Sequence, residues 1–261
     1  MPNESEPASG KRRPRSRRRR IAFGAFCAAV AIVAAFALYT WLTLPDVSGL
    51  RTSDPATTSL MRLQAAQAAK KGIRLSVERA WVAFDRIPDM LKKCVLVSED
   101  ASFYSHKGID FAELKESIKR DIRERRLVRG GSTITQQLAK NLYLSGGKTL
   151  GRKLKEFLIA RRLEKALSKD RIFALYLNVI ELGPHVFGVQ AAARHWFAKD
   201  VADLSLEEMV RLTAIIPRPS SSDPRANDAW MKFKGRWIAE TLAAVKAIGE
   251  DESKALVAAF E

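Results

Sequence analysis

Two adjacent carboxylates, Glu99 and Asp100, follow the apolar residues 94–97 and are separated from them only by Ser98. A carboxylate at the end of an apolar segment is partly desolvated, which raises its pKa and suits it to exchange protons near neutral pH. The solvated end of an ordinary helix explains the same local pattern equally well. An aromatic residue, a histidine and a glycine follow at short spacing: Phe103, His106 and Gly108.

A second polar segment, residues 130–145, reads GGSTITQQLAKNLYLS. Thr133 and Gln136 have the spacing of a capping box, which predicts a helix that begins at Ile134. Apolar residues recur every four positions and are expected to face the core: Ile134, Leu138 and Leu142. A polar set lies on another side of this helix, where it either lines a site or faces solvent: Gln137, Lys140 and Asn141.

A third pattern is Arg152 followed by Glu156, after a Gly-Gly-Lys loop that ends at Lys148. Residues four apart share one helix face, so an ordinary surface ion pair of about 0.3 kcal/mol explains them. Arginine before glutamate is the weaker order for such a pair, which favours another use.

These segments together resemble the signature motifs of the peptidoglycan glycosyltransferase family (glycosyltransferase family 51), whose members polymerise glycan strands from lipid II. Residues 99–108 resemble the first motif, residues 131–137 the second and residues 152–156 the third. Residues 169–178 resemble the fourth motif, except that Ala174 stands where the family usually carries glutamate. The resemblance extends over about residues 81–219.

The resemblance implies a mainly α fold: a lysozyme-like glycosyltransferase domain preceded by a single N-terminal transmembrane helix. It makes Glu99 the general base and Glu156 the second active-site carboxylate, which positions cations or a divalent metal, Mg²⁺ or Mn²⁺. No organic cofactor is expected. The substrate-binding residues that it implies are Lys140, Arg152, Lys148, Gln137, Asn141, Ser132, Thr133, Phe103 and His106.

The implied reaction is attack by the 4-hydroxyl of an acceptor sugar on the anomeric carbon of a lipid-pyrophosphate donor. The hydroxyl needs a base, and the departing pyrophosphate needs positive charge. No covalent nucleophile is required, so the anomeric configuration should invert. Two other classes of function stay open: a lytic transglycosylase or hydrolase that cleaves glycan, and a membrane-tethered scaffold for cell-wall synthesis.

A penicillin-binding transpeptidase domain is excluded. Ser145 and Lys148 match S-x-x-K, but no Ser-Asp-Asn or Lys-Thr-Gly sequence follows them. The S-x-x-K match is therefore a coincidence, and the chain looks like a monofunctional polymerase, without transpeptidase activity.

The amino-terminal part predicts a membrane anchor. Residues 1–20 carry eight Lys and Arg against two Glu and are expected to be a disordered basic arm. Residues 21–44 have no charge and span about 36 Å as a helix, enough for a hydrocarbon core of about 30 Å. A buried core helix and a cleaved signal peptide are the alternatives; the length of the run favours an uncleaved anchor.

The positive-inside rule predicts a single-pass protein of the bacterial cytoplasmic membrane, with its N-terminus in the cytoplasm and its catalytic domain outside. After the span, residues 45–75 are expected to form a stalk. Residues 76–261 are expected to form the glycosyltransferase domain, which ends in a helical tail over residues 230–260.

The net charge of +16 leaves about +10 on the external part, beside a bilayer. Such a domain meets anionic headgroups and lipid-linked phosphates, and the chain has no zinc-finger or RNA-binding signature, so nucleic acid is not an expected partner. The basic helix expected over residues 110–129 either faces solvent or contacts anionic lipid. Cys27 and Cys94 are not expected to pair. The expected partners are lipid II and lipid-linked glycan, membrane lipids and other cell-wall synthases.

Overall fold

The computed structural model describes residues 15–111, 113, 115–117, 119, 131–144, 146, 147 and 149–261. The chain divides after Leu44 into two units. Helix α1 (Arg15–Leu42) makes up most of the described part of the first unit. Its segment Arg19–Leu42 is the only stretch of the described residues that is long and apolar enough, by length and composition, to cross a membrane.

Helix α1 begins at Arg15, inside the arm that was expected to be disordered. Arginine is a good helix former, so an apolar helix extends readily into an arginine-rich flank. Residues 1–14 of the arm lie outside the described residues.

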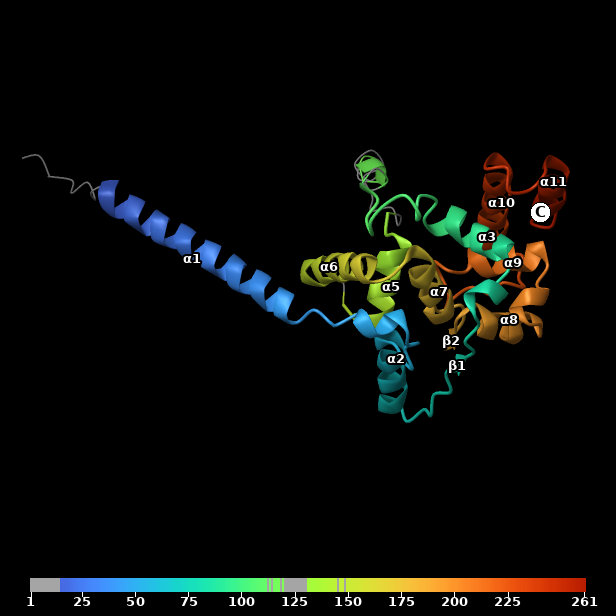
Figure 1. Cartoon of the computed structure of the whole chain (residues 1–261), viewed down its shortest axis with the longest axis horizontal. Helices are drawn as coiled ribbons and strands as arrows, with labels where there is room; N and C mark the ends of the chain where they lie inside the picture. Colours follow the sequence, from blue (N-terminus) through green and yellow to red (C-terminus); the bar gives the residue numbers. More distant parts are fainter. Residues whose placement is uncertain are drawn as a thin grey trace, which may run out of the picture. The chain divides into compact units, whose positions relative to one another are not determined.

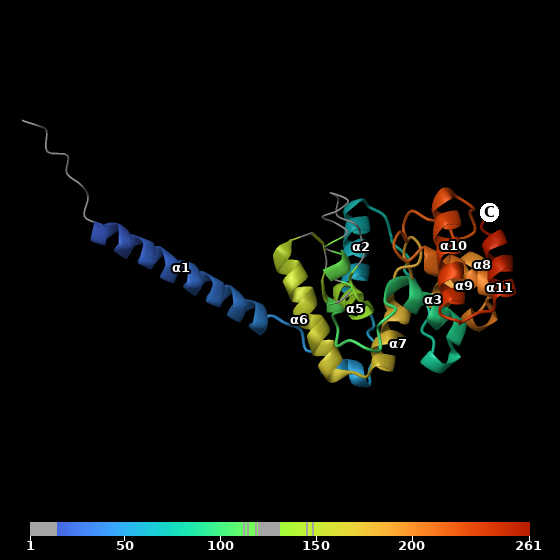
Figure 2. The ribbon, with the colours of Figure 1, turned by 90° about the horizontal axis from the view of Figure 1, so that it is seen from above.

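The regular secondary structure of the second unit is almost all helix, which confirms the prediction of a mainly α fold. Figures 1 and 2 both show two groups of helices, one with α2, α5, α6 and α7 and the other with α3, α8, α9, α10 and α11. The described elements of the second unit, in chain order, are η1 (Ser48–Arg51), α2 (Ser59–Lys70), β1 (Glu78–Arg79), η2 (Phe84–Arg86), α3 (Asp89–Glu99), α5 (Ile134–Tyr143), α6 (Leu150–Ala166), α7 (Lys169–Val179), β2 (Val186–Phe187), α8 (Val189–Phe197), η3 (Val201–Asp203), α9 (Leu206–Ala214), α10 (Ala229–Ala244) and α11 (Glu250–Ala258).

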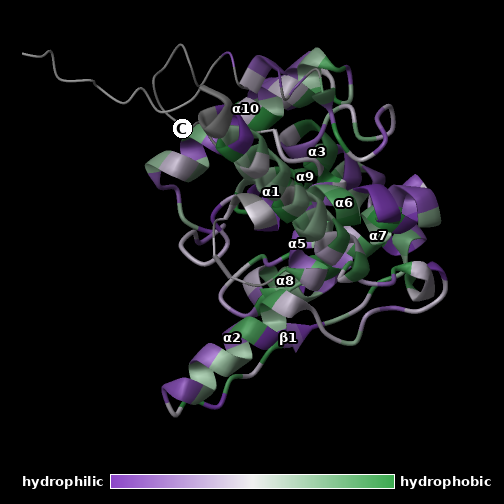
Figure 3. Ribbon diagram, turned by 90° about the vertical axis from the view of Figure 1, so that its left-hand side faces the viewer, coloured by the Kyte–Doolittle hydropathy of each residue, from purple (hydrophilic) through white to green (hydrophobic). Residues whose placement is uncertain are grey.

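Helix α7 lies in the core, and every residue of it from Ile172 to Val179 is buried. Helix α5 packs against α6, α7 and α2. It begins at Ile134 behind the predicted capping box, and the residues predicted to face the core are buried: Ile134, Leu138 and Leu142. Figure 3 shows hydrophobic residues gathered on the inner helices, whereas the far end of α2 is hydrophilic.

The two-residue strands β1 and β2 form a parallel pair in which Glu78 lies opposite Val186. Within the segment 73–84, only β1 is a strand. Asn178 at the end of α7 ties this segment to the core, because its side chain donates to the Val82 carbonyl and accepts from the Val82 amide, at 3.0 and 2.9 Å.

Two segments expected to be peripheral are packed within the second unit. The segment 45–75, expected to be a stalk, contributes α2, which packs against α5. The segment 230–260, expected to be a tail, forms most of α10 and α11, and α10 packs against α3 and α9. Most of the basic helix expected over residues 110–129 lies outside the described residues; Asp110 caps its start by accepting from the amide of Glu113 at 2.9 Å.

Gly188, between β2 and α8, should not tolerate a side chain. Its φ is +85°, and an added Cβ would lie 2.7 Å from the carbonyl oxygen of Asn178. Backbone strain and overlap together should cost about 2–4 kcal/mol. We expect Gly188→Ala to lower the midpoint of thermal unfolding in detergent by about 5 to 10 °C.

The matched control is Gly49→Ala, because nothing lies within 4 Å of a Cβ added there. Its midpoint should stay close to that of the wild type. Equal midpoints for the two variants would contradict the close contact between Gly188 and α7.

Candidate active site

Glu99 is the last residue of α3, and its side chain is half-buried. The carboxylate accepts hydrogen bonds from the Gln137 amide nitrogen and from the Ser98 hydroxyl, both at 3.0 Å. Burial raises the pKa of Glu99 above the ordinary value of 4.5, and the Gln137 hydrogen bond and the positive charge of Lys234 act against that shift. Glu99 is therefore a desolvated carboxylate with two hydrogen-bond donors, an environment suited to a general base.

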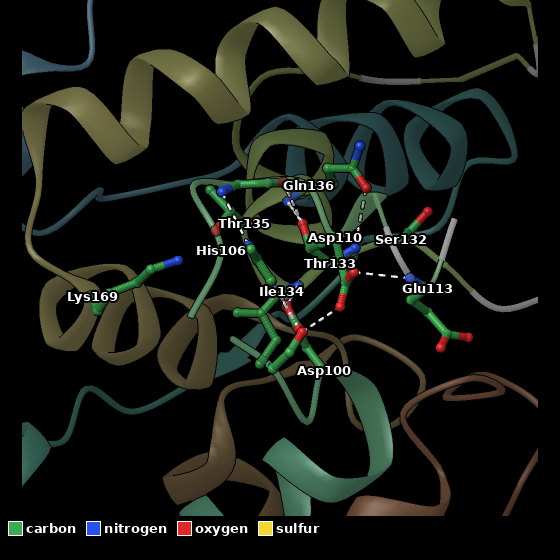
Figure 4. A network of polar contacts seen from close by, with 12 residues as sticks. Asp100, His106, Asp110, Glu113, Ser132, Thr133, Ile134, Thr135, Gln136 and Lys169 are labelled. Atoms are coloured by element: carbon green, nitrogen blue, oxygen red, sulfur yellow. Dashed lines mark hydrogen bonds and ion pairs between the residues drawn. The ribbon is translucent and has the colours of Figure 1, made fainter. Parts of the chain in front are cut away.

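Asp100 joins the loop after α3 to the start of α5 (Figure 4). One of its oxygens accepts from the Ile134 amide at 3.0 Å, and both oxygens lie within 3.0 Å of His106 Nε2. Because the Nδ1 of His106 accepts from the Gly108 amide at 3.1 Å, the Nε2 carries the hydrogen and donates to Asp100. Asp100 is buried, so these contacts fix the position of its neighbour Glu99 relative to α5.

Gln137 connects Glu99 to two other elements. Its amide oxygen accepts from the hydroxyl of Tyr176 on α7 at 3.0 Å. Its amide nitrogen also lies 3.4 Å from the Ser132 carbonyl. The Ser132 hydroxyl contacts Lys153 Nζ at 2.9 Å. A chain of hydrogen bonds therefore runs from Glu99 to a lysine of α6.

Glu156 lies at the other end of this chain and is only 3% exposed. It forms ion pairs with Lys153 and with Arg152, the latter at 3.4 Å. The structure thus brings the two predicted carboxylates into one network but gives them different surroundings: burial dominates around Glu99, and two cations contact Glu156.

A hollow of about 280 Å³ lies on the cation side of the site. Arg152 takes part in its wall, and the guanidinium Nε of Arg152 is buried without a hydrogen-bond partner. A buried donor without a partner is costly, so this atom is available to an anionic ligand. The lining residues are Leu60, Lys140, Asn141, Leu144, Gly146, Gly147 and Arg152.

Lys140 reaches this hollow from α5 and keeps an exposed side chain. Partial desolvation lowers its pKa, whereas the negative charge of Glu156 raises it. The neighbouring Arg152 and Lys153 lower it further. Three cations thus gather around one carboxylate, an arrangement that a polyanion such as pyrophosphate would complete.

Three residues expected to bind substrate are held by contacts with other protein groups. Phe103 is 0% exposed and packs against Phe173, with ring centroids 5.6 Å apart. His106 donates its Nε2 hydrogen to the buried carboxylate of Asp100. Thr133 is buried, caps α5 and donates to the Gly108 carbonyl at 2.7 Å. In this structure the bonding of Phe103, His106 and Thr133 places them in the scaffold of the site, and their direct contact with substrate stays a prediction.

The remaining predicted residues lie around the site or outside the described structure. Ser132 and Gln137 lie between the two carboxylates, and Asn141 lines the hollow, although it is mostly buried. Lys148 lies outside the described residues.

The residues around Glu156 do not fit a metal site made by the protein alone. Its carboxylate already contacts Arg152 and Lys153. Across the described parts of the chain, no group of three His, Cys, Asp or Glu side chains could hold a metal ion. The position that was expected to admit a divalent cation is thus occupied by protein cations, which supply the same sign of charge.

Three residues of the network were not among the predicted site residues. Lys153 is adjacent to Arg152 in the third motif, so spacing could have indicated it. Tyr176 lies in the fourth motif, but only the fold shows that its hydroxyl reaches Gln137. Lys234 carries no local signal, because the fold brings α10 close to Glu99. Lys234 is half-buried, and its ammonium group lies 3.9 Å from the centre of the Trp237 ring.

Comparison with known proteins identifies the family of this chain. The sequence model of the transglycosylase family matches residues 67–243. A biosynthetic peptidoglycan transglycosylase of Nitrosospira multiformis is 40% identical over 73% of this chain and 83% of its own length. Proteins of the same name from Chromobacterium violaceum and Alcanivorax borkumensis are 39% and 40% identical, over 83% and 85% of this chain and 95% and 86% of their own lengths. These matches confirm the predicted resemblance and its lysozyme-like fold, and this chain belongs to the transglycosylase family.

Proposed function

We propose that this protein polymerises peptidoglycan glycan strands from lipid II, with inversion at the anomeric carbon and loss of undecaprenyl pyrophosphate. The observation that carries the proposal is the network of two unlike carboxylates. Desolvated Glu99 stands at one end, and Glu156 with its cations stands at the other, beside a hollow with an unpartnered Arg152 donor.

In this mechanism Glu99 accepts the proton of the acceptor 4-hydroxyl as the new glycosidic bond forms. The bond from the anomeric carbon to the pyrophosphate oxygen breaks, and Lys140 and Arg152 neutralise the charge that develops on the leaving group. Glu156 holds Arg152 and Lys153 in place. Lys148 remains a proposed third cation for the leaving group. We propose that the reaction uses no organic cofactor.

The alternatives lack a supporting observation. A glycan-cleaving enzyme needs a protonated glutamate but no cations for a pyrophosphate, and a scaffold needs neither. The names of the relatives support a biosynthetic glycosyltransferase. We also propose that the activity is monofunctional, since the chain carries no transpeptidase motifs.

We further propose that α1 anchors the protein in the cytoplasmic membrane as a single pass. The basic residues before it support a cytoplasmic N-terminus and an external catalytic domain. This arrangement would bring the site to lipid-linked substrate and to anionic headgroups. Association with other cell-wall synthases stays a proposal.

The first test is glycan-strand formation from purified lipid II, with products separated by size. We expect Glu99→Gln to lower the rate by about 10²- to 10⁴-fold, the range for loss of a general base. Glu240→Gln, at an exposed glutamate of α10, is the control and should make long strands. A wild type that shortens preformed glycan and makes no polymer would replace the proposal with the cleaving reaction.

The cation cluster makes a second prediction. Arg152→Met should lower kcat by about 10²- to 10³-fold, because a donor to the leaving group is lost. Arg161→Met, at an exposed position of the same helix, should leave kcat unchanged. If both variants kept wild-type kcat, the role of Arg152 in leaving-group stabilisation would be refuted.

The pH dependence of kcat makes a third prediction. A base acts when deprotonated, so the rate rises as the pH passes upward through its pKa. Burial raises the pKa of Glu99, and the Lys234 charge holds it down. Lys234→Met should therefore move the acid limb to higher pH. Lys232→Met on the same helix is the control; a limb that stays in place or moves to lower pH in Lys234→Met would contradict the electrostatic role.

A further inference from the structure

The hydroxyl of Tyr176 is buried behind the proposed base. Tyr176 lies on α7, its side chain is fully buried, and its hydroxyl donates to the Gln137 amide oxygen at 3.0 Å. Burial raises the pKa of the hydroxyl well above its ordinary value of 10.0. The group therefore keeps its proton across any pH at which the enzyme works and can act only as a fixed donor toward Gln137.

This donor decides which end of the Gln137 amide faces Glu99. A glutamine amide has an accepting oxygen at one end and a donating nitrogen at the other. With the oxygen held by Tyr176, the nitrogen points to the Glu99 carboxylate at 3.0 Å. If the amide turned over, its oxygen would face the carboxylate, and the contact would favour the protonated acid instead of the base.

The Ser132 carbonyl also accepts from the amide nitrogen, but its distance is 3.4 Å, at the weak end of hydrogen-bond geometry. Tyr176 makes the shorter contact and approaches from a helix that is buried along most of its length. The orientation of Gln137 thus depends chiefly on α7.

We propose that Tyr176 is a positioning residue for Glu99 and acts through Gln137, holding the amide in the orientation that stabilises the carboxylate as the base. This inference rests on the proposed function, in which Glu99 takes the acceptor proton. The residue lies outside the two motifs that contain Glu99 and Gln137, and the fold connects it to them.

The other groups around Glu99 act independently of this contact. Ser98 donates to the carboxylate from α3 itself, and Lys234 on α10 favours the charged form. The charge of Asp100 disfavours it. None of these groups contacts the Gln137 amide through an interaction described above, so removal of the Tyr176 hydroxyl isolates one contribution.

The test compares Tyr176→Phe with wild type by measuring kcat and KM on lipid II as a function of pH. The substitution removes one oxygen and keeps the ring in the core. We expect the acid limb of kcat to move to higher pH, with a rate on that limb about 5-fold below wild type, as loss of one net hydrogen bond implies. The rate on the alkaline side and the KM should stay close to wild type.

Tyr104→Phe is the matched control, because its hydroxyl donates to Asp170 at 2.9 Å and its side chain is exposed. Its pH profile should match that of the wild type. A Tyr176→Phe profile that also matches the wild type, in protein with an unchanged unfolding midpoint, would overturn the inference.

Gln137→Met tests whether the effect passes through the amide. The variant should move the same limb in the same direction, and adding Tyr176→Phe to it should have no further effect. An additive shift in the double variant would overturn the inference. If Tyr176→Phe fails to fold, Gln137→Met alone tests the inference. An acid limb of kcat that stays at the wild-type pH in Gln137→Met would show that the amide does not affect Glu99, and would overturn the inference.

Glu99→Gln separates this inference from the proposed function. If Glu99→Gln retains full polymerase activity, the base assignment fails, whatever Tyr176→Phe shows. If Glu99→Gln is inactive and the Tyr176→Phe profile is unmoved, only the role of Tyr176 fails.

Discussion

The site depends on one buried carboxylate, Asp100, and on the donors that surround it. The residue follows Glu99 directly and accepts hydrogen bonds from the Ile134 amide and from His106. An unpaired buried charge would be strongly unfavourable, whereas a carboxylate with fixed donors at a helix N-terminus is stabilised by both the hydrogen bonds and the helix dipole. The position of Glu99 relative to α5, and therefore to Gln137, follows from this arrangement.

The two candidate catalytic carboxylates differ because their surroundings differ. Glu99 lies at the end of an apolar helix, where desolvation favours proton uptake. Glu156 is more deeply buried but contacts Lys153 and Arg152. When two acids are held in unlike environments, one can exchange protons while the other organises positive charge. This division matches a reaction that needs a base on the acceptor side and cations on the leaving-group side.

Helices that lie far from Glu99 in the sequence complete the site. Helix α10 packs against α3 and carries Lys234, whose charge favours the ionised form of Glu99. Helix α7 supplies Tyr176 from the core, next to the position where Ala174 stands in place of the usual glutamate of the family motif. Ala174 is buried, so a loss of charge at this position leaves the packing of α7 intact.

The sequence by itself determined the helices and the motif residues, because caps, apolar periodicity and the order of motif residues are local properties. The start of α5 at Ile134 and the position of Glu99 at the end of α3 could be predicted this way. Tertiary structure alone decided that Phe103 is buried and that Lys153 joins Ser132 to Glu156. It also decided that the charge of Lys234 acts on Glu99 and that the Tyr176 hydroxyl bonds to Gln137. Burial and long-range hydrogen bonds depend on which helices pack together, and residue spacing along one chain does not contain that information.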